Sequence, residues 1–348
     1  MDKHRNTTLA NEQIAKEADL KYMDCSVPGI NRRVRGKGFS FHFPDGNLVT
    51  DPKVLKRIKE LAIPPAWSKV WVCKSAQGHI QATGYDKRKR KQYLYHQDWV
   101  KLRSETKFFQ LYQFGKKLPK IRKSIAHDIG LAGLPVQKVL ATVVSLLLKV
   151  HARIGNIFYE DQNGTYGLTT LRDEHVTISK NAIELKFPGK KNINQHLSLH
   201  SSTISKIIRK CRDLPGETLF QYIDKNGKPQ AIDSCMVNSY IRSIGDAPFT
   251  AKDFRTWSGS VLAVEFLLRH TLPESMKERE KLVLEVIRKV AKRLGNTPTI
   301  CRKYYIHPLI IGTYCSDNWE KLLSGKTSAN HFYNKSEKLL LKLLKADQ

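Results

Sequence analysis

One apolar helix constrains the fold of this chain more than any other segment. Between Pro135 and about Asn156, aliphatic residues recur at the helical spacing i, i+3, i+4 and i+7, namely Val139, Leu140, Val143, Val144, Leu147 and Val150. The nearly apolar run inside this segment is far too short to span a bilayer, and the N-terminus lacks the apolar region of a signal peptide. We therefore expect a soluble, intracellular protein with this helix at the core of a helical domain.

The pattern of residue types changes near Trp99, from strand-like to helical. Before it, Gly, Pro, Asn and Asp punctuate short alternating runs such as Phe39–Phe43 and Val70–Cys73, with one helix expected near 52–62. After it, the patterns predict helices at about 100–113, 118–130, from 197 onward and in a tail at 336–345, interrupted by β-like pieces at Tyr166–Leu171, Val176–Ile178 and Ala182–Phe187.

These patterns predict an α+β fold in three parts. A polar lead-in occupies residues 1–24, a small β-rich domain residues 25–98, and a larger, mainly α domain with a β-hairpin insert residues 99–348. With 348 residues, two domains are the expected number for such a chain.

The charge of the chain indicates a polyanionic partner. Sixty Lys and Arg residues oppose 32 Asp and Glu residues, for a formal net charge of +28, which is more than solubility requires. The basic residues are spread along the chain rather than gathered on one amphipathic helix, which favours nucleic acid over a membrane surface. Charge alone is also compatible with a non-enzymatic, architectural DNA-binding protein.

Several kinds of site are disfavoured by residue spacing. The six cysteines are far apart, without a C-x-x-C pair or zinc-ligand spacing, and are expected to be reduced. The compact acidic group Asp173–His175 reads as a solvated turn rather than as a two-metal site. Gly325-Lys-Thr327 looks like the end of a P-loop, but Glu320 stands where the first glycine is needed. We therefore expect no ATP site.

An isolated pair of tyrosines, Tyr304 and Tyr305, ends a short predicted helix beside basic residues. A helix expected from near Pro273 to Gly295 comes first, with acidic residues early and basic residues late. Thr followed by Pro then predicts a second helix from about 298 to 306. On spacing alone, these tyrosines would be packed core residues.

The sequence around this pair changes that interpretation. Gly295-Asn-Thr-Pro298 with Tyr305 resembles the nucleophile region of type IB DNA topoisomerases of the small poxvirus-like and bacterial class. In that family, the tyrosine follows by nine positions a His or Asn within a Gly-[His/Asn]-Thr-Pro turn, as Tyr305 follows Asn296. The resemblance runs from about Gly29 to Ile310 and implies that Tyr305 is the nucleophile, assisted by Asn296.

The resemblance implies three further catalytic residues. Arg153 precedes a run that is similar to the segment around the family's first arginine, although a lone arginine at a helix end would be structural. Arg255, in Thr-Ala-Lys-Asp-Phe-Arg-Thr-Trp, matches the second arginine motif almost letter for letter. Lys190, in Phe-Pro-Gly-Lys, matches a lysine at a hairpin tip, which selects it over Lys191. Lys252 stands where the related tyrosine recombinases have His, which favours a topoisomerase.

Together these residues suit attack by a phenol on a phosphodiester. A tyrosine hydroxyl has a pKa of about 10, so attack needs a positive field and a proton acceptor, for which water suffices. In such an attack, Arg153 and Arg255 would donate paired hydrogen bonds to the nonbridging oxygens, and Asn296 would add one more. Lys190 would protonate the leaving 5′ oxygen. A 3′-phosphotyrosine bond keeps the energy of the broken bond, so neither ATP nor a required metal is expected.

The run from Lys87 to Lys91, followed by Gln-Tyr-Leu-Tyr, mixes charge with planar side chains. A charge run is usually a solvated face, and this one also fits a nuclear localisation patch. Its surroundings are similar to the part of the family's N-terminal domain that meets the DNA major groove. The DNA contacts implied by the resemblance are Lys87, Arg88, Arg90, Gln92, Tyr93, Tyr95 and Tyr159.

The resemblance therefore implies a monomeric isomerase that clamps double-stranded DNA between two domains and relaxes supercoils through a transient nick. A tyrosine recombinase, which shares the chemistry, and an architectural DNA-binding protein are the alternatives. No membrane partner is expected, and the location would be the cytoplasm or nucleoid, or a virion if the protein is viral. No role for the residues after about 316 follows from the sequence.

Overall fold

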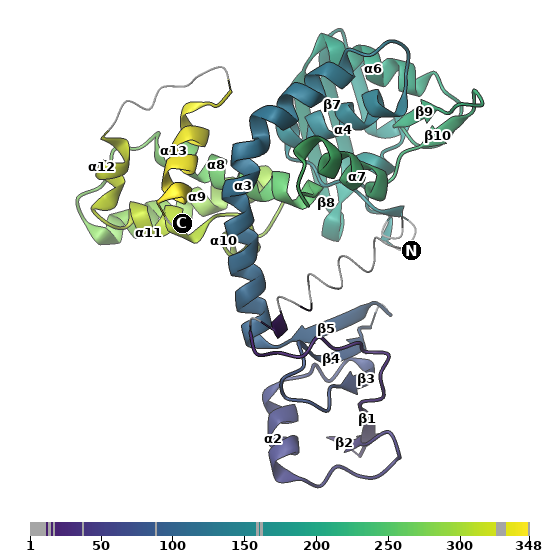
Figure 1. Ribbon diagram of the computed structural model, residues 1–348, viewed down its shortest axis with the longest axis vertical. Coiled ribbons are helices and arrows are strands. Elements are labelled where there is room, and N and C mark those ends of the chain that lie inside the picture. The colour runs from purple at the N-terminus through teal and green to yellow at the C-terminus, as the bar shows by residue number, and fades with distance from the viewer. Residues whose placement is uncertain are drawn as a thin grey trace. The chain divides into compact units, whose positions relative to one another are not determined.

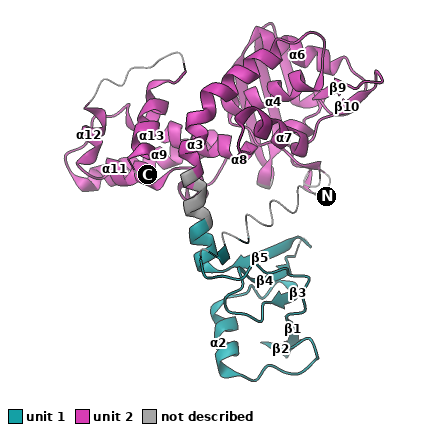
Figure 2. Ribbon diagram, viewed as in Figure 1, with its two compact units in different colours: residues 1–107 teal, residues 108–348 magenta. Residues whose placement is uncertain are grey.

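The computed structural model (Figure 1) describes residues 12, 15, 16, 18–36, 38–87, 89–157, 160, 163–324 and 332–346, without the side chains of residues 103–107, 109 and 191. The chain forms two compact units, residues 1–107 and 108–348 (Figure 2). The first is built on an antiparallel sheet, and the second is mainly helical with two small sheets. The expected α+β class is therefore confirmed. The domain limits at 24/25 and 98/99 stay predictions.

Unit 1 contains a five-stranded antiparallel sheet in the order β2-β1-β3-β4-β5. Its strands are β1 (Ile30–Arg35), β2 (Gly38–His42), β3 (Ser68–Val72), β4 (Ile80–Tyr85) and β5 (Lys91–Tyr95). The helix expected near 52–62 is α2 (Pro52–Glu60), and its Ile58 packs with Val72 and Ala82 on one face of the sheet. Because side chains alternate along a strand, Tyr93, next to Leu94 of that face, lies on the opposite face.

Part of the expected lead-in belongs to unit 1. The Lys21 backbone N–H donates to the Gln77 carbonyl, at 2.8 Å. The Tyr22 ring stacks on the buried His79 ring, with 4.3 Å between centroids, and Leu20 packs with Trp99. Residues 20–22 thus extend the folded structure beyond the sheet.

A single helix, α3 (Gln97–Ile129), replaces the two helices expected at 100–113 and 118–130, and the boundary between the units lies inside it. Pro119 lies within α3 and has no N–H to donate to the carbonyl of Gly115. The Tyr333 hydroxyl donates to that carbonyl instead, at 2.9 Å. Buried side chains on both sides of the proline, Phe114 and Ile121 among them, hold one continuous apolar stripe in the core, so the helix continues.

The apolar helix predicted as the core of unit 2 is buried among other elements of that unit. That helix is α4 (Val136–Val150), whose residues from Val139 to Leu147 are all buried. The other helices are α6 (Ser202–Arg212), α7 (Ser234–Gly245), α8 (Ala251–Leu267), α9 (Met276–Leu294), α10 (Pro298–Tyr304), α11 (Pro308–Tyr314), α12 (Asn318–Leu323) and α13 (Lys335–Lys345). The helices expected before and at the tyrosine pair, and in the tail, are confirmed. No helix in the described ranges is both long and apolar enough to cross a membrane.

Unit 2 also contains small sheets that the sequence predicted only in part. Strands β6 (Val176–Ser179), β7 (Ala182–Gly189) and β8 (Ile193–His200) form one sheet, and β9 (Gln221–Ile223) pairs with β10 (Pro229–Ala231). The helix expected from about 197 was wrong, because β8 continues to His200 and Ser201 caps α6 with its hydroxyl. The β-like piece at Tyr166–Leu171 was also wrong, since residues 168–170 form a 3₁₀ turn.

Candidate active site

The segment that carries Arg153 leaves α4 through a left-handed residue. The helix ends at Val150 rather than near Asn156, because His151 has φ 56° and ψ 26°. The carbonyl of Arg153 then accepts from the Leu168 backbone N–H, at 2.9 Å, instead of continuing the helix. A Cβ on Gly167 would lie 2.3 Å from the Gly155 nitrogen, so this close approach of two backbones requires glycine.

The Arg153 side chain reaches the end of α9. Its Nη2 donates to the Gly295 carbonyl, at 3.1 Å, and to Oδ1 of Asn296. Gly295 ends α9 in the left-handed conformation, and the Asn296 N–H donates to the Ala291 carbonyl, at 2.9 Å. Nδ2 of Asn296 is buried and has no hydrogen-bond partner within the described part of the chain. The turn therefore presents one amide donor beside Arg153.

Arg255 comes from the first turns of α8, a helix fixed by a capping box between Thr250 and Asp253. The side chain is only 5% exposed. Its Nη1 donates to the His151 carbonyl, and its Nη2 donates to the Leu294 carbonyl, at 2.8 Å. One guanidinium therefore ties the end of α4 to the end of α9.

Tyr305 lies directly after α10, and its N–H donates to the Cys301 carbonyl, at 2.9 Å. The guanidinium of Arg255 lies over the Tyr305 ring, 5.3 Å from its centroid. The adjacent Tyr304 instead has the ammonium of Lys303 above its ring. Of the two tyrosines, Tyr305 is the one that lies against Arg255.

Lys190 follows β7 at the tip of the β7–β8 hairpin and is exposed. The hairpin lies close to the end of α9, because a Cβ on Gly295 would come within 2.7 Å of Oε1 of Gln195 in β8. The structure thus brings Arg153, Arg255, Asn296 and Tyr305 together and sets Lys190 on a neighbouring, exposed turn.

The centre retains positive charge. Burial first and the nearby Arg255 second lower the pKa of Arg153 to about 10, while Tyr305 opposes the change. Burial also lowers the pKa of Arg255, again opposed by Tyr305. Burial, followed by Arg293 and Arg255, lowers the pKa of His151 to about 4. Near pH 7 the imidazole is therefore neutral, while Arg153, with a pKa near 10, stays charged, as does the Arg255 guanidinium beside it.

The described partners of these two arginines are neutral. Arg153 and Arg255 donate to carbonyls and an amide, whereas the structural residues Arg122 and Arg172 donate to Glu337 and Glu160. A buried cation without a carboxylate partner attracts an anion. The arrangement suits a phosphate group beside a phenol.

Comparison with known proteins identifies the family. Residues 89–319 match the model of the eukaryotic DNA topoisomerase I catalytic core, and residues 38–86 match that of the bacterial DNA topoisomerase IB N-terminal domain. DNA topoisomerase 1B of Acanthamoeba polyphaga mimivirus is 32% identical over 287 residues, which cover 80% of this chain and 85% of the relative. This chain belongs to the type IB DNA topoisomerases. DNA topoisomerase 1B of vaccinia virus (strain Copenhagen) is 24% identical over 311 residues, covering 83% and 94%.

All but one of the implied DNA contacts of the topoisomerase lie on or just before β5 in the sequence, and the exception is Tyr159. Tyr93 and Tyr95 are exposed, with stacked rings 6.0 Å apart, and the ammonium of Lys91 lies 5.6 Å from the Tyr93 centroid. Gln92 lies on the other side of the strand, where its amide donates to Asp86, at 3.0 Å. Lys87 is exposed, and Arg90 forms an ion pair with Asp86 at 2.6 Å. Arg88 and Tyr159 lie outside the described residues.

Ser260 is a residue of the topoisomerase site that sequence reasoning missed. Its buried hydroxyl donates to the Tyr305 carbonyl, at 3.3 Å, and accepts from the His307 N–H, at 3.1 Å. Gly259 beside it leaves room for the tyrosine segment, since a Cβ there would lie 2.5 Å from the Tyr305 carbonyl oxygen. The signal was present in the sequence as small polar residues inside an apolar helix. A hydroxyl buried on such a helix needs a partner.

Proposed function

We propose that Tyr305 of this type IB topoisomerase attacks a DNA phosphodiester and forms a 3′-phosphotyrosine bond, which lets supercoils relax before the strand is resealed. The assignment rests on the position of the Tyr305 ring against the guanidinium of Arg255. This buried cation donates to backbone carbonyls and has no carboxylate partner among the residues that the structure describes. That cation stabilises the phenolate that forms during attack, because opposite charges interact strongly in a dry site.

Arg153, Arg255 and Asn296 stabilise the transition state in this proposal. The two guanidiniums stay charged at neutral pH and donate to the nonbridging oxygens as negative charge grows on them. The buried Nδ2 of Asn296, unpaired among the described residues, supplies a third donor. Because their carbonyl partners already hold these side chains in place, little reorganisation accompanies the reaction.

Lys190 acts as the general acid. Attack forms the bond between the Tyr305 oxygen and phosphorus and breaks the bond between phosphorus and the 5′ oxygen. The phenol proton goes to water, and the leaving oxygen takes a proton from the Lys190 ammonium. Resealing reverses each transfer. One phosphodiester is exchanged for another, so the cycle consumes no nucleotide.

In the same proposal, unit 1 binds duplex DNA through the β5 segment. Lys87, Arg88 and Arg90 contact phosphates, and Gln92, Tyr93 and Tyr95 lie near base edges, with Tyr159 as a further contact from unit 2. One chain supplies all five catalytic residues, so we propose that the enzyme is a monomer. We further propose two domains divided near residue 98 that clamp the duplex, and an intracellular location, or a virion if the protein is viral.

Incubation with supercoiled plasmid, EDTA and no ATP tests the proposal. We expect a ladder of relaxed topoisomers, and rapid denaturation should trap protein on the 3′ end of the nicked strand through Tyr305. A recombinase would instead give strand-exchange products from paired sites, and an architectural protein would give no covalent adduct. Strand exchange would contradict the proposed relaxation of supercoils, and the absence of an adduct would contradict the proposed attack by Tyr305.

A further inference from the structure

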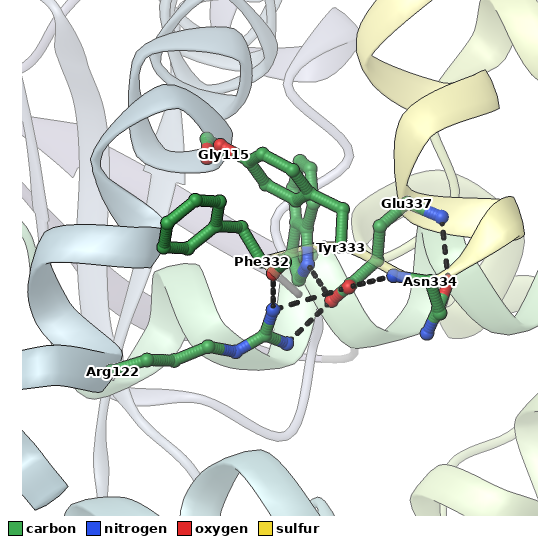
Figure 3. Close-up of polar contacts among 7 residues, drawn as sticks. Gly115, Arg122, Phe332, Tyr333, Asn334 and Glu337 are labelled. Carbon is green, nitrogen blue, oxygen red and sulfur yellow. Dashed lines mark hydrogen bonds and ion pairs between the residues drawn. The ribbon is translucent and has the colours of Figure 1, made fainter. Parts of the chain in front are cut away.

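A buried carboxylate in the tail joins three segments of unit 2. Glu337, in the first turn of α13, is 4% exposed and lies at the centre of Figure 3. Arg122 of α3 donates to its two oxygens, at 2.7 and 3.2 Å, and the Asn334 N–H donates at 3.1 Å. The indole N–H of Trp257 in α8 donates to the same carboxylate, at 3.3 Å.

A second set of contacts fastens the tail at the same place. The Gly115 carbonyl, which Pro119 cannot bond, accepts from the Tyr333 hydroxyl, and Arg122 donates to the Phe332 carbonyl, at 2.6 Å. A Cβ on Gly115 would lie 2.5 Å from the Trp257 ring, so the indole packs directly on the α3 backbone. The segment 332–346 therefore meets α3 and α8 around Trp257.

Trp257 and Arg255 lie on opposite sides of α8. Residues two positions apart on a helix are separated by about 200° around its axis. Arg255 faces the Tyr305 ring and the carbonyls of His151 and Leu294, whereas Trp257 faces Glu337. A short stretch of helix moves as a rigid body. If α8 shifts where Trp257 meets Glu337, Arg255 on the opposite side of the helix therefore shifts as well.

We propose that residues 332–346 brace the catalytic helix, with Glu337 as a positioning residue that places Arg255 through Trp257. This inference rests on the role of Arg255 in the proposed function. It gives the tail a task that the sequence left unassigned. The carboxylate suits the task, because it accepts from a charged and a neutral donor on two different helices and is closed off from water.

Two substitutions test the brace, with one matched control. Trp257→Phe removes only the indole N–H and part of the ring, and Glu337→Gln removes the charge. We expect each to slow single-turnover cleavage of a bound duplex by about tenfold or more, the scale of a lost bond to a charged group, with the Kd for DNA within about twofold. Glu265→Gln removes a half-buried carboxylate from the same α8, paired with Arg269, and should leave cleavage unchanged.

Coupling to Arg255 decides between positioning and general stability. In an Arg255→Ala background, Trp257→Phe should slow cleavage by less than about twofold, since the group that it positions is gone. Thermal melting of each variant shows that the fold is kept, and Trp257→Phe carries the test if Glu337→Gln does not fold. The brace is refuted if Trp257→Phe slows cleavage by the same factor in the Arg255→Ala background as in the unmodified enzyme. It is also refuted if Trp257→Phe alone leaves cleavage unchanged. Absence of cleavage in the unmodified enzyme would instead refute the proposed function.

Discussion

The active centre of unit 2 and the β5 face of unit 1 use the same basic residue types in different ways. The β5 face comprises the exposed residues on and just before β5, namely Lys87, Lys89, Arg90, Lys91, Tyr93 and Tyr95. In the centre, Arg255 is buried and donates to backbone carbonyls at the ends of two helices. On the β5 face, Lys91 is exposed, and Arg90, just before the strand, pairs with the carboxylate of Asp86. The centre therefore holds its cations buried without cancelling their charge, whereas the β5 face carries exposed cations, one of them paired with a carboxylate.

This difference separates the two tasks of a topoisomerase. A fixed, uncancelled charge stabilises a transition state, because its position need not change as the reaction proceeds. An exposed lysine contributes long-range attraction to phosphates, which is weakened by salt and tolerant of sequence. Substitutions in the centre should thus change rates, and those on the β5 face should change affinity.

The largest expected effect comes from the nucleophile. Tyr305→Phe should bind DNA normally yet form no covalent adduct, because only the attacking oxygen is removed. Gel mobility of plasmid topoisomers and trapping of the adduct by detergent measure the two outcomes. Tyr304→Phe is the matched control, since it removes the same oxygen from a neighbour whose ring lies under Lys303. Loss of the adduct in Tyr304→Phe alone would show that the assignment is off by one residue.

The next largest effect is on the pH dependence of the free energy of unfolding, through His151. His151 has a pKa of about 4 in the folded state against 6.5 for the free side chain. Between these values the unfolded chain binds a proton that the folded chain does not, so the free energy of unfolding falls as pH drops. The loss from this group is roughly 3 kcal/mol by pH 4, with no further change below that pH or above about 6.5.

His151→Asn checks this sign, since Asn tolerates the left-handed backbone and does not titrate. Chemical denaturation at several pH values should show a weaker dependence in the variant between pH 6.5 and 4. The buried His79 of unit 1, whose pKa burial also lowers, remains as an internal reference in both proteins. Identical pH profiles for the variant and the parent would mean that His151 is not shielded from water.

The parts of the centre that lie in local motifs were predictable. Gly295 ends one helix in the left-handed conformation, and Thr297 caps the next. These local signals place Asn296 between the two helices and Tyr305 at the end of the second, so their relative positions could be predicted from the sequence. The tertiary partners were not. Nothing in the sequence indicates that Arg255 donates to the His151 carbonyl, because that bond depends on how α4 ends and where α8 packs.

Long-range contacts also explain the wrong predictions for local structure. Two helices were expected at 100–113 and 118–130, but one helix spans both, and Tyr333, far along the chain, satisfies the carbonyl that Pro119 leaves open. Likewise β8 pairs with β7 along its full length through His200, which overrides the helical pattern after 197. Both errors arose where a tertiary partner supplied what the local sequence lacked.

Lys190 shares features of both regions, because it is exposed like the residues of the β5 face and is proposed to act in catalysis like the residues of the centre. Lys190→Ala should slow cleavage by about a hundredfold. A duplex with sulfur in place of the bridging 5′ oxygen has a leaving group that hardly needs a proton, so it should largely restore the rate. Single-turnover cleavage of both duplexes measures the rescue.

Arg153→Ala and Arg255→Ala provide the comparison, since they lack charge stabilisation of the nonbridging oxygens and should gain much less from sulfur. Lys191→Ala, the adjacent lysine, should need no rescue. Equal rescue of the lysine and arginine variants would remove Lys190 from the role of general acid. So would rescue confined to Lys191→Ala.

The smallest effect is expected on the β5 face. Replacing Lys87, Lys89 and Lys91 by Gln should weaken binding about tenfold at physiological salt, on every DNA sequence. The dependence of log K on log salt should fall by about one for each phosphate that the variant no longer neutralises. Cleavage of already bound DNA should hardly change, and fluorescence anisotropy across a salt series measures the affinity.

The control for this variant has Lys277, Lys281 and Arg288 replaced by Gln, which removes the same charge from the exposed side of α9. It should bind DNA more tightly than the β5 variant, because its substitutions lie away from the proposed DNA-binding strand. If the two proteins lose affinity equally, total charge rather than the β5 face governs binding, and the contrast drawn between the two regions fails for unit 1.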